Sequence, residues 1–170
     1  MAGTDLRSLT LGEILRLHGA IGGELKRRDV SRTGNNPCAD FAEYLFCRTF
    51  GWHQNPNSKA GYDATDDQGL RYEIKARRIS RAGGSRQVSA LRRLAARPFD
   101  RLAGVVFDAD YRVLLALDIP YEVVVARSVH IEHTNSGRFF LRDDLRSEPG
   151  VRDLTAQVTR AAAHILSGHA

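Results

Sequence analysis

Two short β-prone runs around a tight polar turn are the feature that most constrains the fold of this chain. The runs are Gly61–Thr65 and Leu70–Ala76, and Asp66-Asp67-Gln68-Gly69 lies between them. Asp- and Gly-rich turns between such runs are typical of antiparallel hairpins. Because side chains alternate along a strand, Glu73 and Lys75 should share one face, and Ile74 should point into the core. Pairing of the two strands should bring Asp63 within a few ångströms of Glu73.

The rest of the chain predicts helices and further strands around this hairpin. Apolar residues recurring three to five positions apart indicate an amphipathic helix or helix pair over 5–28 and a helix over 37–50 that Gly51 ends. We further expect helical structure over 87–96, strands over 104–108 and 112–118, a short helix over 120–126, a strand over 139–141 and a helix over 151–167. The predicted fold class is α/β, a mixed central sheet flanked by helices. Residues 1–30 are expected to form a helical extension of a domain over 31–170. We expect this extension, and the segment after about residue 127, either to serve dimerisation or to cover the sheet.

Positive charge is concentrated in one segment of the chain. The net charge is 25 − 20 = +5, but residues 71–101 alone carry 10 basic and 2 acidic side chains, or +8. Residues 1–70 carry 8 basic and 9 acidic side chains, and residues 102–170 carry 7 basic and 9 acidic side chains. The rest of the chain is therefore nearly neutral. A local cationic stripe on a near-neutral body is typical of a protein that binds a polyanion, although a solvated basic surface would give the same count.

Several function classes are disfavoured by what the sequence lacks. No apolar run is longer than about six residues, so we expect no membrane span. The N-terminus shows no basic start followed by an apolar stretch, and the two cysteines, Cys38 and Cys47, suit a reducing cytoplasm better than a disulfide or a zinc site. Neither a phosphate-binding Gly-Lys-Ser/Thr loop nor a dinucleotide fingerprint after a strand is present, so we expect no nucleotide cofactor.

The paired carboxylates of the hairpin predict a site for a hard divalent cation. Two carboxylates as close as Asp63 and Glu73 repel each other unless a cation lies between them. Mg²⁺ prefers oxygen ligands, is often held by one or two carboxylates, and could also take the backbone carbonyl of Ile74. A lysine beside the metal, Lys75, could orient or help deprotonate an attacking water, which an arginine cannot do. The same spacing also suits a surface hairpin with a Glu/Lys ladder worth a few tenths of a kcal/mol.

The pattern Asp63–x9–Glu73–x–Lys75 resembles the signature of the PD-(D/E)xK nuclease superfamily, which has the restriction-endonuclease-like fold. In that family a helix precedes the strands, a further helix and a last strand follow them, and a helical Glu often completes the site. Glu43, on the predicted 37–50 helix, suits that role. The resemblance covers about residues 37–118 and is strongest to uncharacterised bacterial restriction-type domains. One departure is that Tyr62, not Pro, precedes Asp63.

The resemblance implies a Mg²⁺-dependent DNA endonuclease of restriction or defence type in the bacterial cytoplasm, acting as a homodimer, with Mn²⁺ as a substitute metal. Asp63, Glu73 and the Ile74 carbonyl would bind the metal, Lys75 would activate water, and Glu43 would support the site. The expected DNA contacts are the basic and polar residues that follow, namely Arg77, Arg78, Arg81, Arg86, Gln87, Arg92 and Arg93. The alternatives are a repair or junction-resolving nuclease on the same scaffold, and a non-catalytic DNA-binding module with a decayed site.

Overall fold

The fold is an α/β arrangement of a mixed central sheet and four α-helices. A computed structural model describes residues 5–32, 36–56, 61–81 and 83–168. Its helices are α1 (Leu11–Arg27), α2 (Cys38–Phe50), α3 (Tyr121–Arg127) and α4 (Thr155–Leu166), with 3₁₀ turns η1 (Leu6–Ser8), η3 (Leu94–Ala96), η4 (Glu132–Thr134) and η5 (Asp143–Ser147). Its strands are β1 (His53–Gln54), β2 (Ala64–Thr65), β3 (Arg71–Arg78), β4 (Leu91–Arg92), β5 (Arg101–Phe107), β6 (Val113–Pro120), β7 (Val129–Ile131), β8 (Ser136–Arg138) and β9 (Arg152–Asp153).

The predicted hairpin is the β2–β3 pair of the central sheet. Its six strands follow the order β1-β2-β3-β5-β6-β9, in which β3 and β5 are parallel and the other neighbours are antiparallel. Ala64 lies opposite Tyr72, and the turn between the strands is closed by hydrogen bonds to Asp66. Because β2 has only two residues, it covers only the first part of β3. The rest of that edge of β3 is therefore left free of strand pairing.

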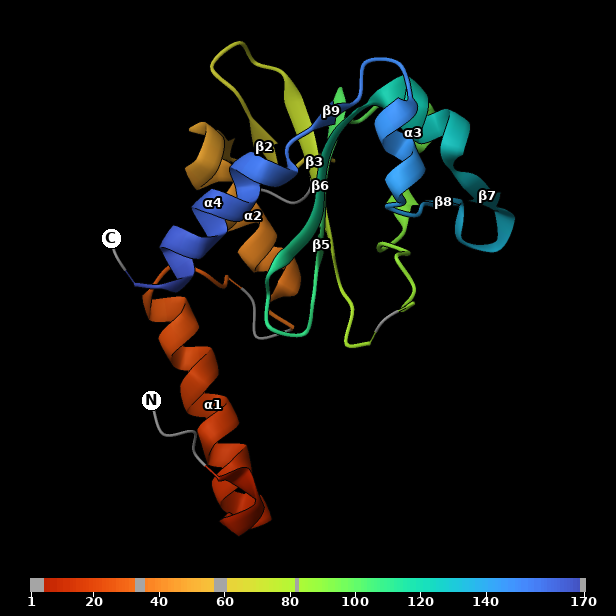
Figure 1. Ribbon diagram of the computed structural model, residues 1–170. Coiled ribbons are helices and arrows are strands. Elements are labelled where there is room, and N and C mark those ends of the chain that lie inside the picture. Colours follow the sequence, from red (N-terminus) through yellow and green to blue (C-terminus); the bar gives the residue numbers. More distant parts are fainter. Residues whose placement is uncertain (1–4, 33–35, 57–60, 82, 169–170) are drawn as a thin grey trace.

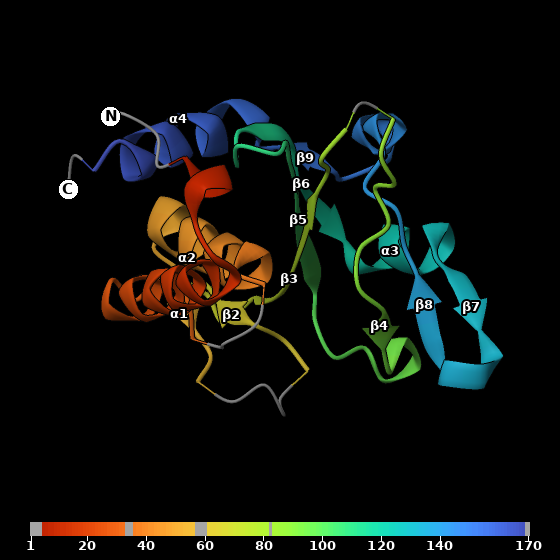
Figure 2. The same ribbon diagram turned by 90° about the horizontal axis from the view of Figure 1, so that it is seen from below.

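Helices and a second sheet cover the two faces of the central sheet. Helices α2 and α4 lie on one face, and α3 lies on the other with the three-stranded sheet β4-β8-β7 (Figures 1 and 2). Because successive side chains of a strand point to opposite faces of the sheet, the core consists of two apolar clusters, one on each side. Ile74 and Ala103 pack with Phe41 and Leu45 of α2, whereas Leu102 packs on the opposite side with residues of α3 and of the chain around the second sheet. Strands β5 and β6 thus contribute to both apolar clusters, whereas β3 contributes only to the cluster beneath α2.

Local sequence explains why α2 begins and ends where it does. The Asn36 side chain accepts a hydrogen bond from the backbone N–H of Cys38, which satisfies one of the free donors of the first turn. Gly51 ends the helix in the left-handed region, at φ +71°, where a side chain would be strained. The end at Gly51 agrees with the sequence prediction.

Two predicted elements are wrong. Residues 87–96 form the short strand β4 and the turn η3 rather than a helix, so Arg92 lies in a strand and Arg93 in a left-handed turn position. The strand predicted at 139–141 is absent: β8 lies just before it, at Ser136–Arg138, and Phe140 forms only an isolated bridge to Gln87. The last strand of the chain is β9. Tertiary pairing decides both, because Leu91 of β4 pairs with Gly137 of β8, far away in sequence.

The N-terminal segment forms η1 and one continuous helix, α1, rather than two helices. Thr10 and Glu13 make a reciprocal capping box at its start. The helix extends away from the sheet instead of covering it (Figure 1). Among the described residues, no helix is long and apolar enough to cross a bilayer.

Candidate functional site

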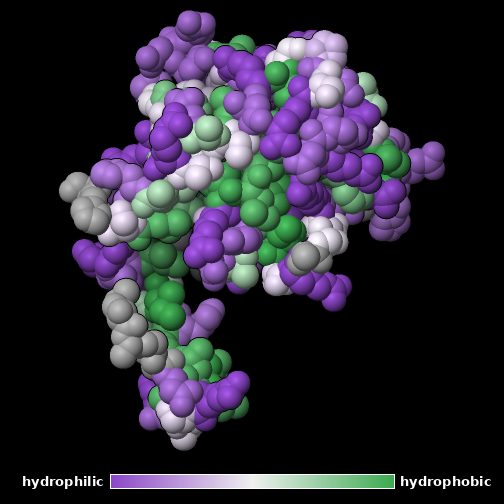
Figure 3. Space-filling view, viewed as in Figure 1, coloured by the Kyte–Doolittle hydropathy of each residue, from purple (hydrophilic) through white to green (hydrophobic). Residues whose placement is uncertain are grey.

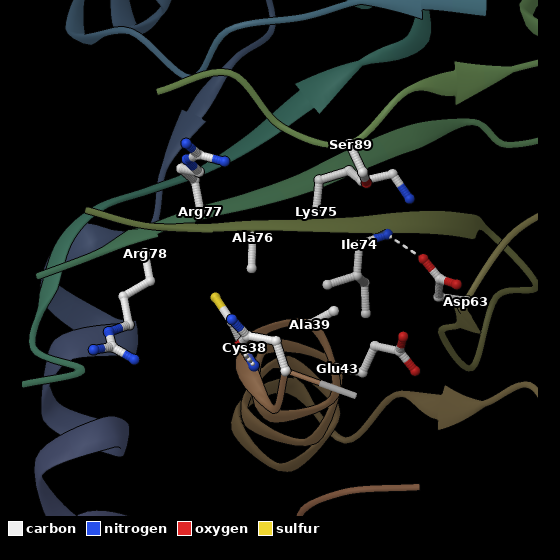
Figure 4. A pocket seen from close by; sticks show the side chains of 11 residues that line it. Cys38, Ala39, Glu43, Asp63, Ile74, Lys75, Ala76, Arg77, Arg78 and Ser89 are labelled. Atoms are coloured by element: carbon white, nitrogen blue, oxygen red, sulfur yellow. Dashed lines mark hydrogen bonds between the residues drawn. The ribbon is translucent and has the colours of Figure 1, made fainter. Parts of the chain in front are cut away.

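Three of the four predicted catalytic residues, Glu43, Asp63 and Lys75, line a pocket at the free edge of β3, next to β2, whereas Glu73 does not line it and pairs with Lys75. This pocket of about 280 Å³ is also lined by Ile74, Ser89 and the first residues of α2. In Figure 4, Lys75 and Arg77 extend from one face of β3, and Ile74 and Ala76 extend from the other toward α2, which carries Glu43. The pocket therefore wraps around the strand edge.

Asp63 is held in place by the backbone of the strand beside it. Its Oδ2 accepts a hydrogen bond of 2.7 Å from the backbone N–H of Ile74 (Figure 4). In a strand, the N–H and C=O of one residue point toward the same neighbour, so the Ile74 carbonyl also faces this free edge. The carboxylate of Asp63 and the carbonyl predicted to join it are therefore on the same side of β3.

Glu73 and Lys75 project from the same face of β3, as the alternation predicted, and form an ion pair with each other. Their side chains are 16% and 15% exposed, so the pair is largely shielded from solvent. Burial raises the pKa of Glu73, the charge of Lys75 lowers it, and the negative charge of Asp63 raises it again. The charge of Lys75 therefore stabilises the ionised form of Glu73, which burial and the charge of Asp63 disfavour.

Glu43 is a buried carboxylate of α2 with partners of its own. Arg32 forms an ion pair with it, and the Gln54 amide donates a hydrogen bond of 2.9 Å. Burial raises the pKa of Glu43, and the charge of Asp63 raises it further, against the effects of Gln54 and Arg32. Asp40, one turn earlier, accepts from the Ser31 hydroxyl and the Arg32 backbone N–H, which anchors the segment that presents Arg32.

These three carboxylates affect one another electrostatically. Asp63 disfavours the charged forms of Glu43 and Glu73, and Glu43 disfavours that of Glu73. Repulsion between these carboxylates lowers the stability of the folded protein. A cation bound among them would relieve the repulsion. Among the described residues, Lys75 and Arg32 supply positive charge to this group, by pairing with Glu73 and Glu43 respectively.

The donor set at this edge suits magnesium in its chemistry. Asp63, Glu73 and the Ile74 carbonyl offer only oxygen ligands, and a Mg²⁺ ion needs one or two carboxylates because it keeps several waters. In the described part of the chain, however, no three His, Cys, Asp or Glu side chains are grouped closely enough to hold a metal ion. A metal bound here would thus take two carboxylates, a carbonyl and waters, and Glu73 would have to turn from Lys75 toward it.

The predicted DNA contacts are not all at this pocket. Arg77 and Arg78 line it, and the Arg77 guanidinium also donates to the Ser85 carbonyl, which ties the following loop to β3. Arg86 forms an ion pair with Asp143, Gln87 bridges to Phe140, and Arg81 is exposed. Arg92 and Arg93 are exposed on β4 and the turn after it, and neither lines the pocket.

Two arginines that the sequence analysis did not select extend this basic surface. Arg138 and Arg142 flank Phe140, with guanidinium carbons 6.0 and 4.9 Å from the ring centre. Phe140 is the residue that bridges to Gln87, so this group adjoins the basic loop. A groove that combines arginine and an aromatic ring is typical of nucleic-acid contacts. The pattern Arg138-x-Phe140-x-Arg142 could have indicated this grouping from the sequence, since residues two apart in an extended segment share a face.

No model of a known protein family matches this chain, and a search of curated proteins finds no match.

Proposed function

We propose that this protein is a Mg²⁺-dependent DNA endonuclease with a restriction-endonuclease-like core and its site at the free edge of β3. The observation that carries the proposal is the gathering of Glu43, Asp63 and Lys75 around one open pocket, with Glu73 paired to the lysine. These groups come from a helix and two strands of a hairpin, as the resemblance to PD-(D/E)xK nucleases requires. The connection from β3 to β5 departs from that family, because it holds β4 and η3 where a helix is expected.

Electrostatics supports the same proposal. Three mutually repelling carboxylates favour a divalent cation, and Arg77 and Arg78, at the rim of the same pocket, suit a phosphate backbone. A surface hairpin with an ordinary Glu/Lys ladder would not need a third carboxylate buried on α2. It would also leave the Glu73–Lys75 pair in solvent, whereas both side chains are largely buried.

The proposed reaction adds water across a P–O bond of the DNA backbone. Bound Mg²⁺ would supply positive charge to the phosphate and acidify a water. Asp63 and Glu73 would hold the metal at the strand edge, beside the Ile74 carbonyl. Lys75, released from Glu73, would orient the attacking water and offset the negative charge of the phosphate. The water would lose its proton to solvent, and the leaving oxygen would take one up from solvent. Glu43, fixed by Arg32 and Gln54, would position the water from the α2 side.

The proposal is tested by comparing Asp63→Asn with Asp67→Asn on supercoiled plasmid in Mg²⁺ and in EDTA. Asn at position 63 can still accept from Ile74 but lacks the charge, and Asp67 is an exposed carboxylate of the nearby turn. We expect Mg²⁺-dependent nicking by the wild type and the Asp67 variant, and a loss of at least 100-fold in the Asp63 variant. Equal rates in both variants would contradict the proposed site.

Two further experiments separate the alternatives. A repair or junction-resolving nuclease would cut branched DNA in preference to linear duplex, so the two substrates are compared at equal concentration. A DNA-binding module with a decayed site needs no metal, so calorimetric titration with Mg²⁺ would give no heat of binding while DNA binding persists. Mg²⁺ binding that is lost in Asp63→Asn favours the enzyme over the module.

A further inference from the structure

Helix α1 has no role in the proposed nuclease site. It projects from the body of the molecule (Figure 1), and none of its seventeen residues, all in the described part of the chain, is buried. Four of these residues are glycines, each of which costs up to about 1 kcal/mol inside a helix. A helix of this length is marginal in water even with good helix formers. Its stability therefore calls for a partner that covers its apolar side.

The exposed apolar residues of α1 form a single stripe. Leu11, Leu15 and Ile21 are 72%, 63% and 52% exposed, although leucine and isoleucine favour burial. At about 100° per residue, these three fall on one side of the helix, within an arc of about 120°. The stripe as a whole consists of Leu11, Ile14, Leu15, His18, Ile21, Gly22 and Leu25.

The spacing of the stripe is the same from either end. Leu11 and Leu25 lie seven residues before and after His18, and Ile14 and Ile21 lie near the midpoints of these two halves. A second α1 laid antiparallel and crossing at His18 would therefore place Leu11 of each copy beside Leu25 of the other. Apolar positions meet apolar positions along the whole contact, which is the requirement for a two-fold symmetric interface.

Charge favours the antiparallel orientation over the parallel one. The N-terminal end of this segment carries Asp5, Arg7 and Glu13, for a net charge of −1. The C-terminal end carries Glu24, Lys26, Arg27, Arg28 and Asp29, for a net charge of +1. Antiparallel association sets the acidic end of each copy beside the basic end of the other and opposes the two helix dipoles. Parallel association would bring like charges together at both ends.

An apolar pocket on the body continues the stripe. Leu25 lines a pocket of about 540 Å³ together with Val30, Phe41, Tyr44 and Ile165. Figure 3 shows hydrophobic side chains exposed along α1 and above it, where the helix meets the body. In the antiparallel arrangement, the turn η1 that precedes α1 would lie near the C-terminal end of the other α1, where this pocket is. Leu6 of that turn is 52% exposed and is the apolar residue that would enter the pocket.

From these observations we infer that α1 is a dimerisation helix: two copies of the chain associate through antiparallel α1 helices that cross at His18, each placing its N-terminal turn in the other's apolar pocket. The inference does not depend on nuclease activity. It assigns to residues 5–30 a role that the central sheet does not require, since α1 contributes nothing to either core cluster.

Sedimentation equilibrium tests the dimer. The wild type should have twice the mass of the 18.9 kDa chain. Leu15→Glu together with Ile21→Glu should weaken the dimer at least 100-fold, and Arg16→Glu, on the opposite side of α1, should leave it unchanged. The variants keep a folded domain, because no core residue is altered, and circular dichroism checks this. A monomeric wild type at 100 µM, or a dimer that survives the double substitution, would overturn the inference.

Cysteine cross-linking tests the orientation. In a Cys38→Ala, Cys47→Ala background, a mixture of Leu11→Cys and Leu25→Cys proteins should form a disulfide-linked heterodimer on mild oxidation. Neither protein alone should cross-link efficiently. Self-cross-linking of Leu11→Cys would instead indicate parallel helices and refute the proposed arrangement.

Discussion

The ion pair between Glu73 and Lys75 gives the most informative single perturbation, Lys75→Met. Methionine keeps most of the volume of the side chain but leaves Glu73 without its positive partner. Breaking a fully buried ion pair by removing one member costs about 3 to 5 kcal/mol. Because the two side chains retain 16% and 15% exposure, we expect a loss of about 2 to 3 kcal/mol in the free energy of unfolding at pH 7 without Mg²⁺.

A double-mutant cycle isolates the interaction. In Glu73→Gln with Lys75→Met both charges are absent, so the double variant should recover much of the stability lost in Lys75→Met. Urea unfolding of the four proteins should give a coupling energy of about 1 to 3 kcal/mol.

The pH dependence has a definite sign. Burial raises the pKa of Glu73 in the folded protein, so the folded state binds its proton more tightly than the unfolded chain. This contribution stabilises the protein below the ordinary glutamate pKa and is lost as the pH rises through the raised value. Lys75→Met should thus lose less stability at pH 5 than at pH 7. Additive single substitutions, or an equal loss at both pH values, would refute the reasoning.

Three further predictions follow from other contacts. Gly104→Ala places a Cβ 2.3 Å from Leu141 Cδ2 and should cost about 1 to 3 kcal/mol in thermal unfolding, whereas Gly19→Ala meets no atom within 4 Å and should be neutral or stabilising. Glu43→Gln should raise stability at pH 7 in EDTA, since burial raises the pKa of Glu43 and the charged form is disfavoured there; a loss would show that the ion pair with Arg32 outweighs burial. Replacing Arg138 and Arg142 by Gln should lower the salt slope of DNA binding, measured by fluorescence anisotropy, by about 1.8, and Arg160→Gln should not change it.

Local turn chemistry made the hairpin predictable. Asp66 and Gly69 close a turn whose hydrogen bonds involve only neighbouring residues, and alternation then fixes the faces of Glu73, Ile74 and Lys75. The 37–50 helix was predictable for the same reason, because Gly51 and Asn36 act within one turn of its ends. These residues place the predicted carboxylates without any long-range information.

Long-range packing explains what the sequence did not reveal. Val88, Leu91 and Leu94 recur at helical spacing, yet Leu91 is buried in the cluster under α3 and pairs with Gly137. Such pairing leaves no local signal and overrides helix propensity. The same holds for Arg32, which pairs with Glu43 eleven residues later in the chain while its backbone N–H donates to Asp40.

Cleavage of plasmid DNA by Lys75→Ala and Lys26→Ala tests the central claim most directly. Lys26 is an exposed lysine of α1 that does not line the pocket, so it controls for the loss of one positive charge. We predict Mg²⁺-dependent nicking by the wild type and by Lys26→Ala, and no nicking by Lys75→Ala, with DNA affinity within threefold for all three proteins. Nicking by Lys75→Ala at the wild-type rate would contradict a nuclease site at the edge of β3.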